Sequence, residues 1–202
     1  MVETQTKNIQ RYFSIFIIGN SGVGKTCFIN NFCSRPFIEN HKVTPGIDYV
    51  SKVYSKNDES YIMRLFDSNG NRFNSITKQY LNYANGIIFV YSIDDVNSFN
   101  SIIEWIEFCK TSNISSTTGM LIVGNKSDLV ENRKVTFEEG EKLSKQLGIR
   151  FFEVSSKTGE NVQEAFEYLF DETIFLFSFY PFRKFFLRKR RISKNNQNKC
   201  QS

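Results

Sequence analysis

The 202-residue sequence predicts an α/β fold in which a six-stranded, mostly parallel sheet carries helices on both faces. Short apolar runs alternate with helix-like segments along most of the chain, and such alternation is typical of an open parallel sheet between two helical layers. One connection differs, because residues 55–59 are too few for a crossover helix. The two strands that flank it should therefore form an antiparallel hairpin at the edge of the sheet.

The apolar runs predict strands near residues 12–18, 46–54, 60–66, 86–92, 119–124 and 150–154. The segments between and after them predict helices near residues 24–33, 72–83, 98–111, 136–147 and 160–179. The fourth helix has a clear start, because Thr136 followed by Glu139 forms a capping-box pattern. Ligands bind at the carboxyl ends of the strands in such sheets, so the loops after the strands should carry the functional residues.

The loop after the first strand reads G-N-S-G-V-G-K-T from Gly19 to Thr26 and opens a helix. Its glycines let the backbone point several N–H groups at one centre, where the helix N-terminus adds partial positive charge. This pattern predicts a phosphate-binding loop in which Lys25 reaches the β- and γ-phosphates and Thr26 ligates Mg²⁺. The nucleotide-binding residues expected here are Ser21, Gly22, Val23, Gly24, Lys25, Thr26 and Cys27.

The residues Asn125, Lys126, Ser127 and Asp128 follow the strand near 119–124, and Asn125, Lys126 and Asp128 are expected to bind the nucleotide. A carboxylate such as that of Asp128 can accept two hydrogen bonds from the adjacent N–H donors of guanine, a pair that adenine lacks, and the wrong base leaves a buried charge unpaired. Lys126 would lay its aliphatic stem against the base. The alternative is a solvated turn of ordinary turn residues, which the phosphate-binding loop in the same chain disfavours.

Two further loops after strands carry candidate nucleotide-binding residues. Asp67 ends a strand and can hold Mg²⁺ through water, while the N–H of Gly70 can contact a γ-phosphate; the alternative is a plain turn. After the last strand, a backbone N–H within Ser155, Ser156 and Lys157 could meet the guanine carbonyl.

Four such loops, in this order, resemble a small GTPase of the Ras superfamily, and residues 71–80 and 86–99 resemble its Rab branch. The resemblance runs from about residue 9 to 175. It implies a three-layer P-loop NTPase fold, GTP/GDP and Mg²⁺ as cofactors, and GTP hydrolysis. It further implies that Thr44 ligates Mg²⁺ and touches the γ-phosphate, and that Phe37 flanks the guanine, although Phe37 could instead pack beneath its loop.

The chain departs from the family pattern at the phosphate end. Asn71 stands where the family places the glutamine that orients the attacking water, and its side chain is shorter by one methylene. A misplacement of about 1 Å can slow catalysis by roughly a hundredfold, so slow intrinsic hydrolysis is expected unless a partner supplies the group. The catalytic residues predicted are Asn71, Lys25, Thr44 and Gly70.

Further departures are Pro45, Phe66 and Asn69, where the Rab pattern has other residues. Pro45, Asn69 and Asn71 leave open an alternative function: a pseudo-GTPase scaffold that binds guanine nucleotide and cycles poorly or not at all.

The charge distribution separates the body of the chain from its end. Residues 176–202 contain eight Lys or Arg and no Asp or Glu, so the net charge of +5 becomes −3 for the rest of the chain. A folded basic face for nucleic acid is therefore not expected. The apolar residues 174–180 are too few to span a bilayer.

The basic and aromatic residues after Pro181 suit an anionic membrane surface. The alternatives are that residues 175–179 complete the core and that the charges are solvated or act in nuclear import. Cys200 is third from the end, whereas the C-a-a-X signal needs a cysteine fourth from the end. The sequence therefore leaves two alternatives for Cys200, a single prenyl group or no lipid.

These observations divide the chain into a disordered N-terminus (1–8), a GTPase domain (9–179) and a basic membrane-targeting tail (180–202). No signal peptide is recognised, and Cys27, Cys33 and Cys109 are expected to be buried thiols in a reducing cytosol. The resemblance implies a monomer that meets effectors, exchange factors and GTPase-activating proteins. It places the protein in vesicle traffic, on the cytoplasmic face of an intracellular membrane with a cytosolic pool.

Overall fold

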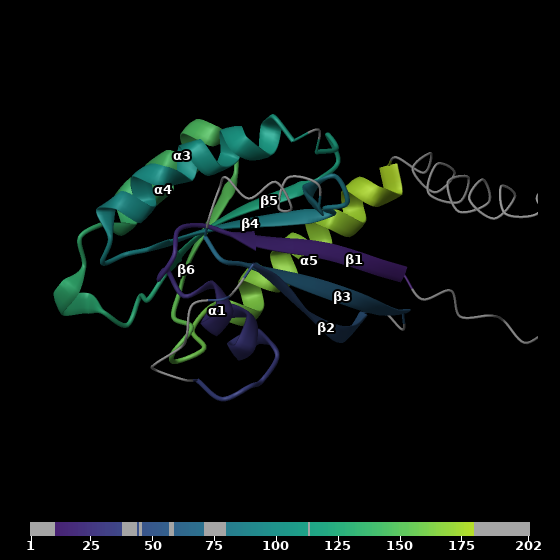
Figure 1. Cartoon of the computed structure of the whole chain (residues 1–202), viewed down its shortest axis with the longest axis horizontal. Helices are drawn as coiled ribbons and strands as arrows, with labels where there is room; N and C mark the ends of the chain where they lie inside the picture. Colours follow the sequence, from purple (N-terminus) through teal and green to yellow (C-terminus); the bar gives the residue numbers. More distant parts are fainter. Residues whose placement is uncertain are drawn as a thin grey trace, which may run out of the picture.

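The computed structural model describes residues 11–37, 44, 46–56, 59–70, 80–112 and 114–179 (Figure 1). These residues form one six-stranded sheet in the order β2-β3-β1-β4-β5-β6. The strands are β1 (Arg11–Ile18), β2 (Ile47–Lys56), β3 (Glu59–Ser68), β4 (Gly86–Ser92), β5 (Gly119–Asn125) and β6 (Arg150–Val154). The helices are α1 (Lys25–Phe32), α3 (Val96–Lys110), α4 (Phe137–Leu147) and α5 (Val162–Phe179), with a short 3₁₀ turn at Val130–Asn132.

The predicted elements agree with these bounds to within two residues. The helix expected near 72–83 is described only from residue 80, where residues 80 and 81 are helical. The N-terminus (1–8) and the tail (180–202) lie outside the described residues.

The predicted hairpin at the sheet edge is confirmed. β2 pairs with β3 in antiparallel register, from Ile47 opposite Ser68 to Lys56 opposite Glu59. All the other pairings, β1 with β3 and β4, β4 with β5, and β5 with β6, are parallel. The carboxyl ends of these five parallel strands therefore meet at one edge of the sheet.

Two apolar cores lie on the two faces of the sheet. Ile15 and Ile17 of β1 pack in the core beneath α1 and α5, whereas Phe16 and Ile18 pack in the core beneath α3 and α4 (Figure 1). This division follows the two-residue period of a strand. Every residue of the central strand β4 is buried, as expected for a strand covered on both faces.

Aromatic contacts attach α5 to the sheet and to α1. The ring of Phe166 stacks on those of Phe28 and Phe32, with centroids 4.6 and 3.9 Å apart. Phe170 meets Phe13 edge-on at 5.4 Å. Phe175, one turn beyond, is 60% exposed, so the alternative in which it completes the core is wrong for this residue.

The cysteine prediction is confirmed in part. Cys109 is buried in α3, but Cys27 and Cys33 are only half-buried, and Cys33 caps α1 instead of lying inside it. All three are free thiols.

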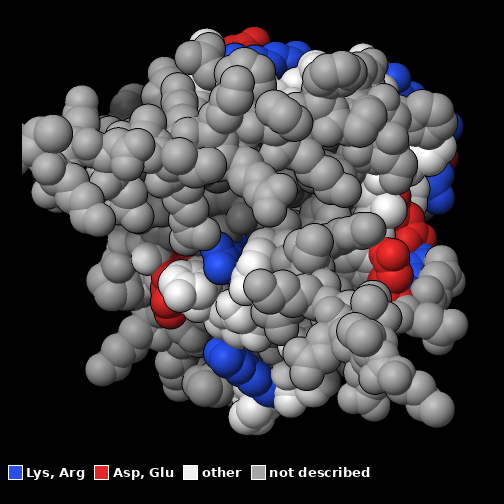
Figure 2. Space-filling view, turned by 90° about the vertical axis from the view of Figure 1, so that its right-hand side faces the viewer, with Lys and Arg blue, Asp and Glu red and all other residues white. Residues whose placement is uncertain are grey.

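Figure 2 views the molecule from the end where β1 begins. Among the described residues on this face, basic and acidic side chains are interspersed. The ion pair of Lys56 Nζ with Asp171 Oδ1, 2.5 Å long, joins the edge strand β2 to α5. In the part of the chain that the structure describes, no helix is both long and apolar enough to cross a bilayer.

We expect Phe166→Ala to lower the free energy of unfolding by about 3–5 kcal/mol, because it removes a fully buried ring and leaves a cavity between α1 and α5. Phe175→Ala on the same helix is the matched control, with an expected change within about 0.5 kcal/mol. Urea denaturation of the two variants measures the difference, and equal losses would contradict this account of the core.

Candidate functional site

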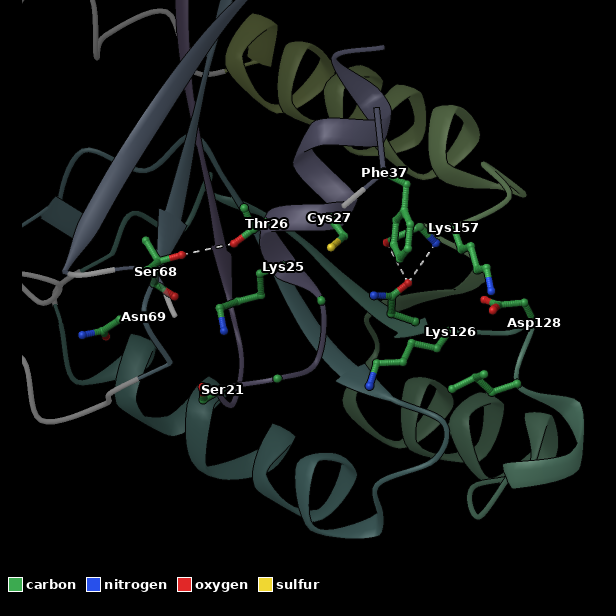
Figure 3. A pocket seen from close by; sticks show the side chains of 16 residues that line it. Ser21, Lys25, Thr26, Cys27, Phe37, Ser68, Asn69, Lys126, Asp128 and Lys157 are labelled. Carbon is green, nitrogen blue, oxygen red and sulfur yellow. Dashed lines mark hydrogen bonds between the residues drawn. The ribbon is translucent and has the colours of Figure 1, made fainter. Parts of the chain in front are cut away.

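A cavity of about 370 Å³ lies where the loops after β1, β3, β5 and β6 meet. Figure 3 shows Ser21, Lys25, Thr26, Ser68 and Asn69 at one end, and Phe37, Lys126, Asp128 and Lys157 at the other. The residues that line the cavity are Ser21, Gly22, Gly24, Lys25, Thr26, Cys27, Phe37, Thr44, Ser68, Asn69, Asn125, Lys126, Asp128, Leu129, Ser156 and Lys157.

The loop between β1 and α1 has the tight curl that its glycines predict. Gly24 has φ of 91° and precedes α1 as its N-cap. A Cβ on Gly24 would lie 2.4 Å from Nδ2 of Asn125, so only glycine fits. Within the described residues no side chain caps α1, so the N–H groups of its first turn remain available to an anion.

Lys25 is buried, with 5% of its surface exposed. Its Nζ donates to the carbonyl oxygens of Gly19 at 2.9 Å and Asn20 at 2.7 Å. Burial lowers the pKa of Lys25 to about 8, and the nearby charge of Asp67 opposes that shift. The ammonium is thus held at the phosphate end of the cavity with little hydration, where an anionic ligand interacts with it strongly.

Three predicted metal ligands come together beside Lys25. Thr26 Oγ1 donates to Asp67 Oδ2 at 2.5 Å, and Thr44 Oγ1 donates to the same oxygen at 3.2 Å. The two hydroxyl oxygens are also 3.2 Å apart. All three side chains offer oxygen, which is the donor that Mg²⁺ prefers, and a set with one carboxylate suits an ion that keeps water and phosphate ligands.

The turn after β3 touches both neighbouring loops. Gly70 has φ of 78°, and a Cβ there would lie 2.5 Å from the backbone nitrogen of Ser21. The N–H of Asn69 donates to the carbonyl of Gly46 at 3.0 Å. The turn therefore connects the phosphate-binding loop with the segment that carries Thr44.

The buried side chain of Asn125 joins three loops. Its Nδ2 donates to the carbonyl of Val23 at 2.8 Å, and its Oδ1 accepts from the N–H of Ser156 at 3.1 Å and the hydroxyl of Ser156 at 2.8 Å. Asn125 was predicted as a binding residue, and the structure shows that its carboxamide also fixes the loops relative to one another.

Asp128 is oriented from behind by a buried serine. Ser155 Oγ donates to Asp128 Oδ1 at 2.6 Å and accepts from the N–H groups of Lys157 at 3.3 Å and Thr158 at 3.1 Å. One carboxylate oxygen of Asp128 is thus held while the side chain lines the cavity next to Lys126 and Lys157 (Figure 3).

Most predicted site residues line the cavity, including Phe37, which is 42% exposed. Val23, Asp67, Gly70 and Ser155 lie behind its wall, where they contact residues that line it. Asn71 lies outside the described residues. The cavity is also lined by three residues for which the sequence predicts no binding role: Ser68, Asn69 and Leu129. Each directly adjoins a predicted site residue, and this adjacency is the signal in the sequence that points to them.

The mixed six-stranded sheet and the arrangement of these four loops define a P-loop protein of the small GTPase class. The chain belongs to the Ras family, whose family model matches residues 14–174. It is a Rab-like small GTPase.

Its relatives include Ras-related protein Rab-13 of Bos taurus, 40% identical over 164 residues, which cover 81% of this chain and 80% of the relative. Ras-related protein Rab-3A of Homo sapiens is 37% identical over 170 residues, 84% of this chain and 77% of the relative. Ras-related protein RIC1 of Oryza sativa subsp. japonica is 37% identical over 155 residues, 76% of each chain.

The lowered pKa of Lys25 predicts a pH effect on stability in the absence of nucleotide. The pKa is about 8 in the folded protein and 10.5 for an unperturbed lysine, so between these values the unfolded chain binds more protons than the folded one. The free energy of unfolding therefore rises with pH across this interval, by on the order of 3 kcal/mol in total.

The measurement is urea denaturation of nucleotide-free wild type and Lys25→Met between pH 7 and about 10. We expect wild type to gain stability relative to Lys25→Met as the pH rises above 8. A difference that stays constant with pH would contradict the lowered pKa.

Proposed function

We propose that this protein is a GTP/GDP switch of the Rab type that uses Mg²⁺, regulates vesicle traffic and hydrolyses GTP slowly. The observation that supports it best is that the phosphate-binding loop, Thr26, Thr44 and the guanine-type loop line one cavity, with Asp67 accepting from both threonine hydroxyls behind its wall. Asn125 holds the two ends of this cavity in fixed relation.

In this proposal, each end of the cavity has its own task. Asp128 accepts hydrogen bonds from guanine, and Lys126 covers the base with its stem, with Phe37 on the border of the same end. Lys25 binds the β- and γ-phosphates. Thr26, Thr44 and Asp67 would hold Mg²⁺, and the bound ion would neutralise charge that develops on the phosphates.

The switch would act through the two loops that meet at the phosphate end. Thr44 and the N–H of Gly70 contact the γ-phosphate, and the bond from Asn69 N–H to the carbonyl of Gly46 couples them. Loss of the γ-phosphate removes both contacts and releases the loops from the state that effectors recognise. Exchange factors and GTPase-activating proteins are the partners that such a cycle requires.

The slow rate is attributed to Asn71, whose shorter side chain would leave the attacking water poorly oriented. We expect Asn71→Gln to raise the single-turnover rate of GTP hydrolysis by roughly 10- to 100-fold. The measurement is the decay of pre-loaded GTP on purified protein, with the GDP dissociation rate as a check that binding is unchanged.

The outcomes separate the proposal from its alternatives. If bound GTP decays equally fast in both proteins, at about 10⁻⁴ s⁻¹ or faster, Asn71 does not slow hydrolysis. Binding without hydrolysis in either protein, even with an activating protein present, would favour the pseudo-GTPase scaffold.

Membrane attachment is proposed for residues 180–202, with residues 9–179 as the nucleotide-binding domain. The support is the charge pattern, since each basic residue near an anionic surface contributes on the order of 1 kcal/mol. A single lipid chain binds a membrane only marginally, so a lipid on Cys200 would act together with the basic residues as a second membrane-binding signal. The protein would then divide between an intracellular membrane and the cytosol.

We expect a chain that ends at Tyr180 to lose co-sedimentation with vesicles containing phosphatidylserine, because the basic residues 183–199 are removed. Binding of GDP should be unchanged in the same protein. Co-sedimentation that persists after truncation would refute the role of the tail.

A further inference from the structure

Lys126, the lysine of the guanine-type loop, pairs with a carboxylate that lies 32 residues earlier in the chain. Its Nζ is 3.4 Å from Oδ1 of Asp94, which follows β4. The two side chains are 32% and 27% exposed, so the pair is partly accessible to solvent, and Lys126 also lines the cavity. Lys126 itself has φ of 67°, a left-handed conformation that directs its side chain out of the regular strand path.

Asp94 is held in place by its surroundings. The hydroxyl of Ser92 donates to the same Oδ1 that meets Lys126. The N–H of Ile93 donates to the carbonyl of Asn125 at 3.0 Å, so the turn with Asp94 is tied to the residue that precedes Lys126. Burial opposes ionisation of Asp94, but the Ser92 hydrogen bond and the Lys126 charge outweigh it and lower its pKa.

We propose that Asp94 is a positioning residue that prolongs the bound state of guanine nucleotides by anchoring the ammonium of Lys126. With Nζ fixed at Asp94 and the backbone fixed after β5, the four-carbon stem of Lys126 is kept extended across the base end of the cavity. The side chain then loses less rotamer freedom when a base packs against it. This inference rests on the proposed function, because it concerns the same guanine site.

The expected effect is modest, since a partly exposed ion pair contributes little. Loss of the pair should speed GDP dissociation by about two- to fivefold. A second effect has the opposite sign, because removal of a negative charge beside the cavity favours binding of an anionic ligand. The test therefore needs a control that removes the same charge at nearly the same place.

Asp95 supplies that control. Its Oδ1 accepts from the N–H of Asn97 at 3.0 Å and caps α3. Asparagine caps helices about as well as aspartate, so Asp95→Asn removes one negative charge beside Asp94 and keeps the helix start. Asp94→Asn removes the same charge and weakens the contact with Lys126.

The experiment measures dissociation of fluorescent GDP and IDP from the full-length wild type, Asp94→Asn, Asp95→Asn, Lys126→Met and the double variant Asp94→Asn/Lys126→Met. We expect Asp94→Asn to release GDP about two- to fivefold faster than Asp95→Asn does. Lys126→Met keeps an apolar stem but lacks the ammonium. In this background, Asp94→Asn should change the GDP dissociation rate by no more than Asp95→Asn changes it in the wild type.

Inosine diphosphate (IDP) distinguishes a lost anchor of the Lys126 side chain from a distorted loop around Asp128. Its base lacks the exocyclic amine that Asp128 would recognise, so a distorted Asp128 loop changes the ratio of GDP to IDP release rates. An effect carried by the lysine stem leaves that ratio as in wild type.

The proposal is overturned if Asp94→Asn and Asp95→Asn release GDP at equal rates, if the effect persists in the Lys126→Met background, or if the GDP to IDP ratio changes. A wild-type protein that binds neither GDP nor GTP would overturn the proposed function and this inference together. The first three results leave the proposed function intact, so the two failures are distinguishable.

Discussion

The carboxamide of Asn125 joins three loops that are far apart in the sequence, and the shape of the site depends on it. Its hydrogen bonds reach Val23 in the phosphate-binding loop and Ser156 in the loop after β6. Buried polar groups that lose their partners are expensive, so this arrangement is strongly favoured over others. The absence of a side chain at Gly24 gives Asn125 the space to reach across.

The two ends of the cavity differ in how closely they follow the family pattern. At the base end, Ser155 donates a hydrogen bond to Asp128, and Ser156 donates to Asn125. The sequence departs from the Rab pattern at Pro45, Phe66, Asn69 and Asn71. Of these, Asn69 lines the phosphate end of the cavity, and Pro45 and Asn71 lie outside the described residues. We therefore expect any divergence from the family's behaviour in GTP hydrolysis and switching more than in recognition of the base.

The burial of the Lys25 ammonium favours phosphate binding but lowers the stability of the fold. Its ammonium is buried and satisfied by the carbonyls of Gly19 and Asn20, yet its pKa falls to about 8 because it has lost most of its hydration. A poorly hydrated cation interacts more strongly with an incoming phosphate than an exposed one does. Such residues are typical of functional sites, where stability is reduced for the sake of binding.

The sequence by itself determined the six strands, the hairpin and the loops that carry the site, because hydrophobic period, glycine spacing and linker length are local properties. Only the tertiary structure decided that Asn125 fixes loops, that Ser155 orients Asp128 from behind, that Gly70 abuts Ser21 and that Asp94 pairs with Lys126. Each of these contacts joins residues on different strands or loops. They depend on which strands are neighbours and in what register, and residue spacing along one segment carries no information about that.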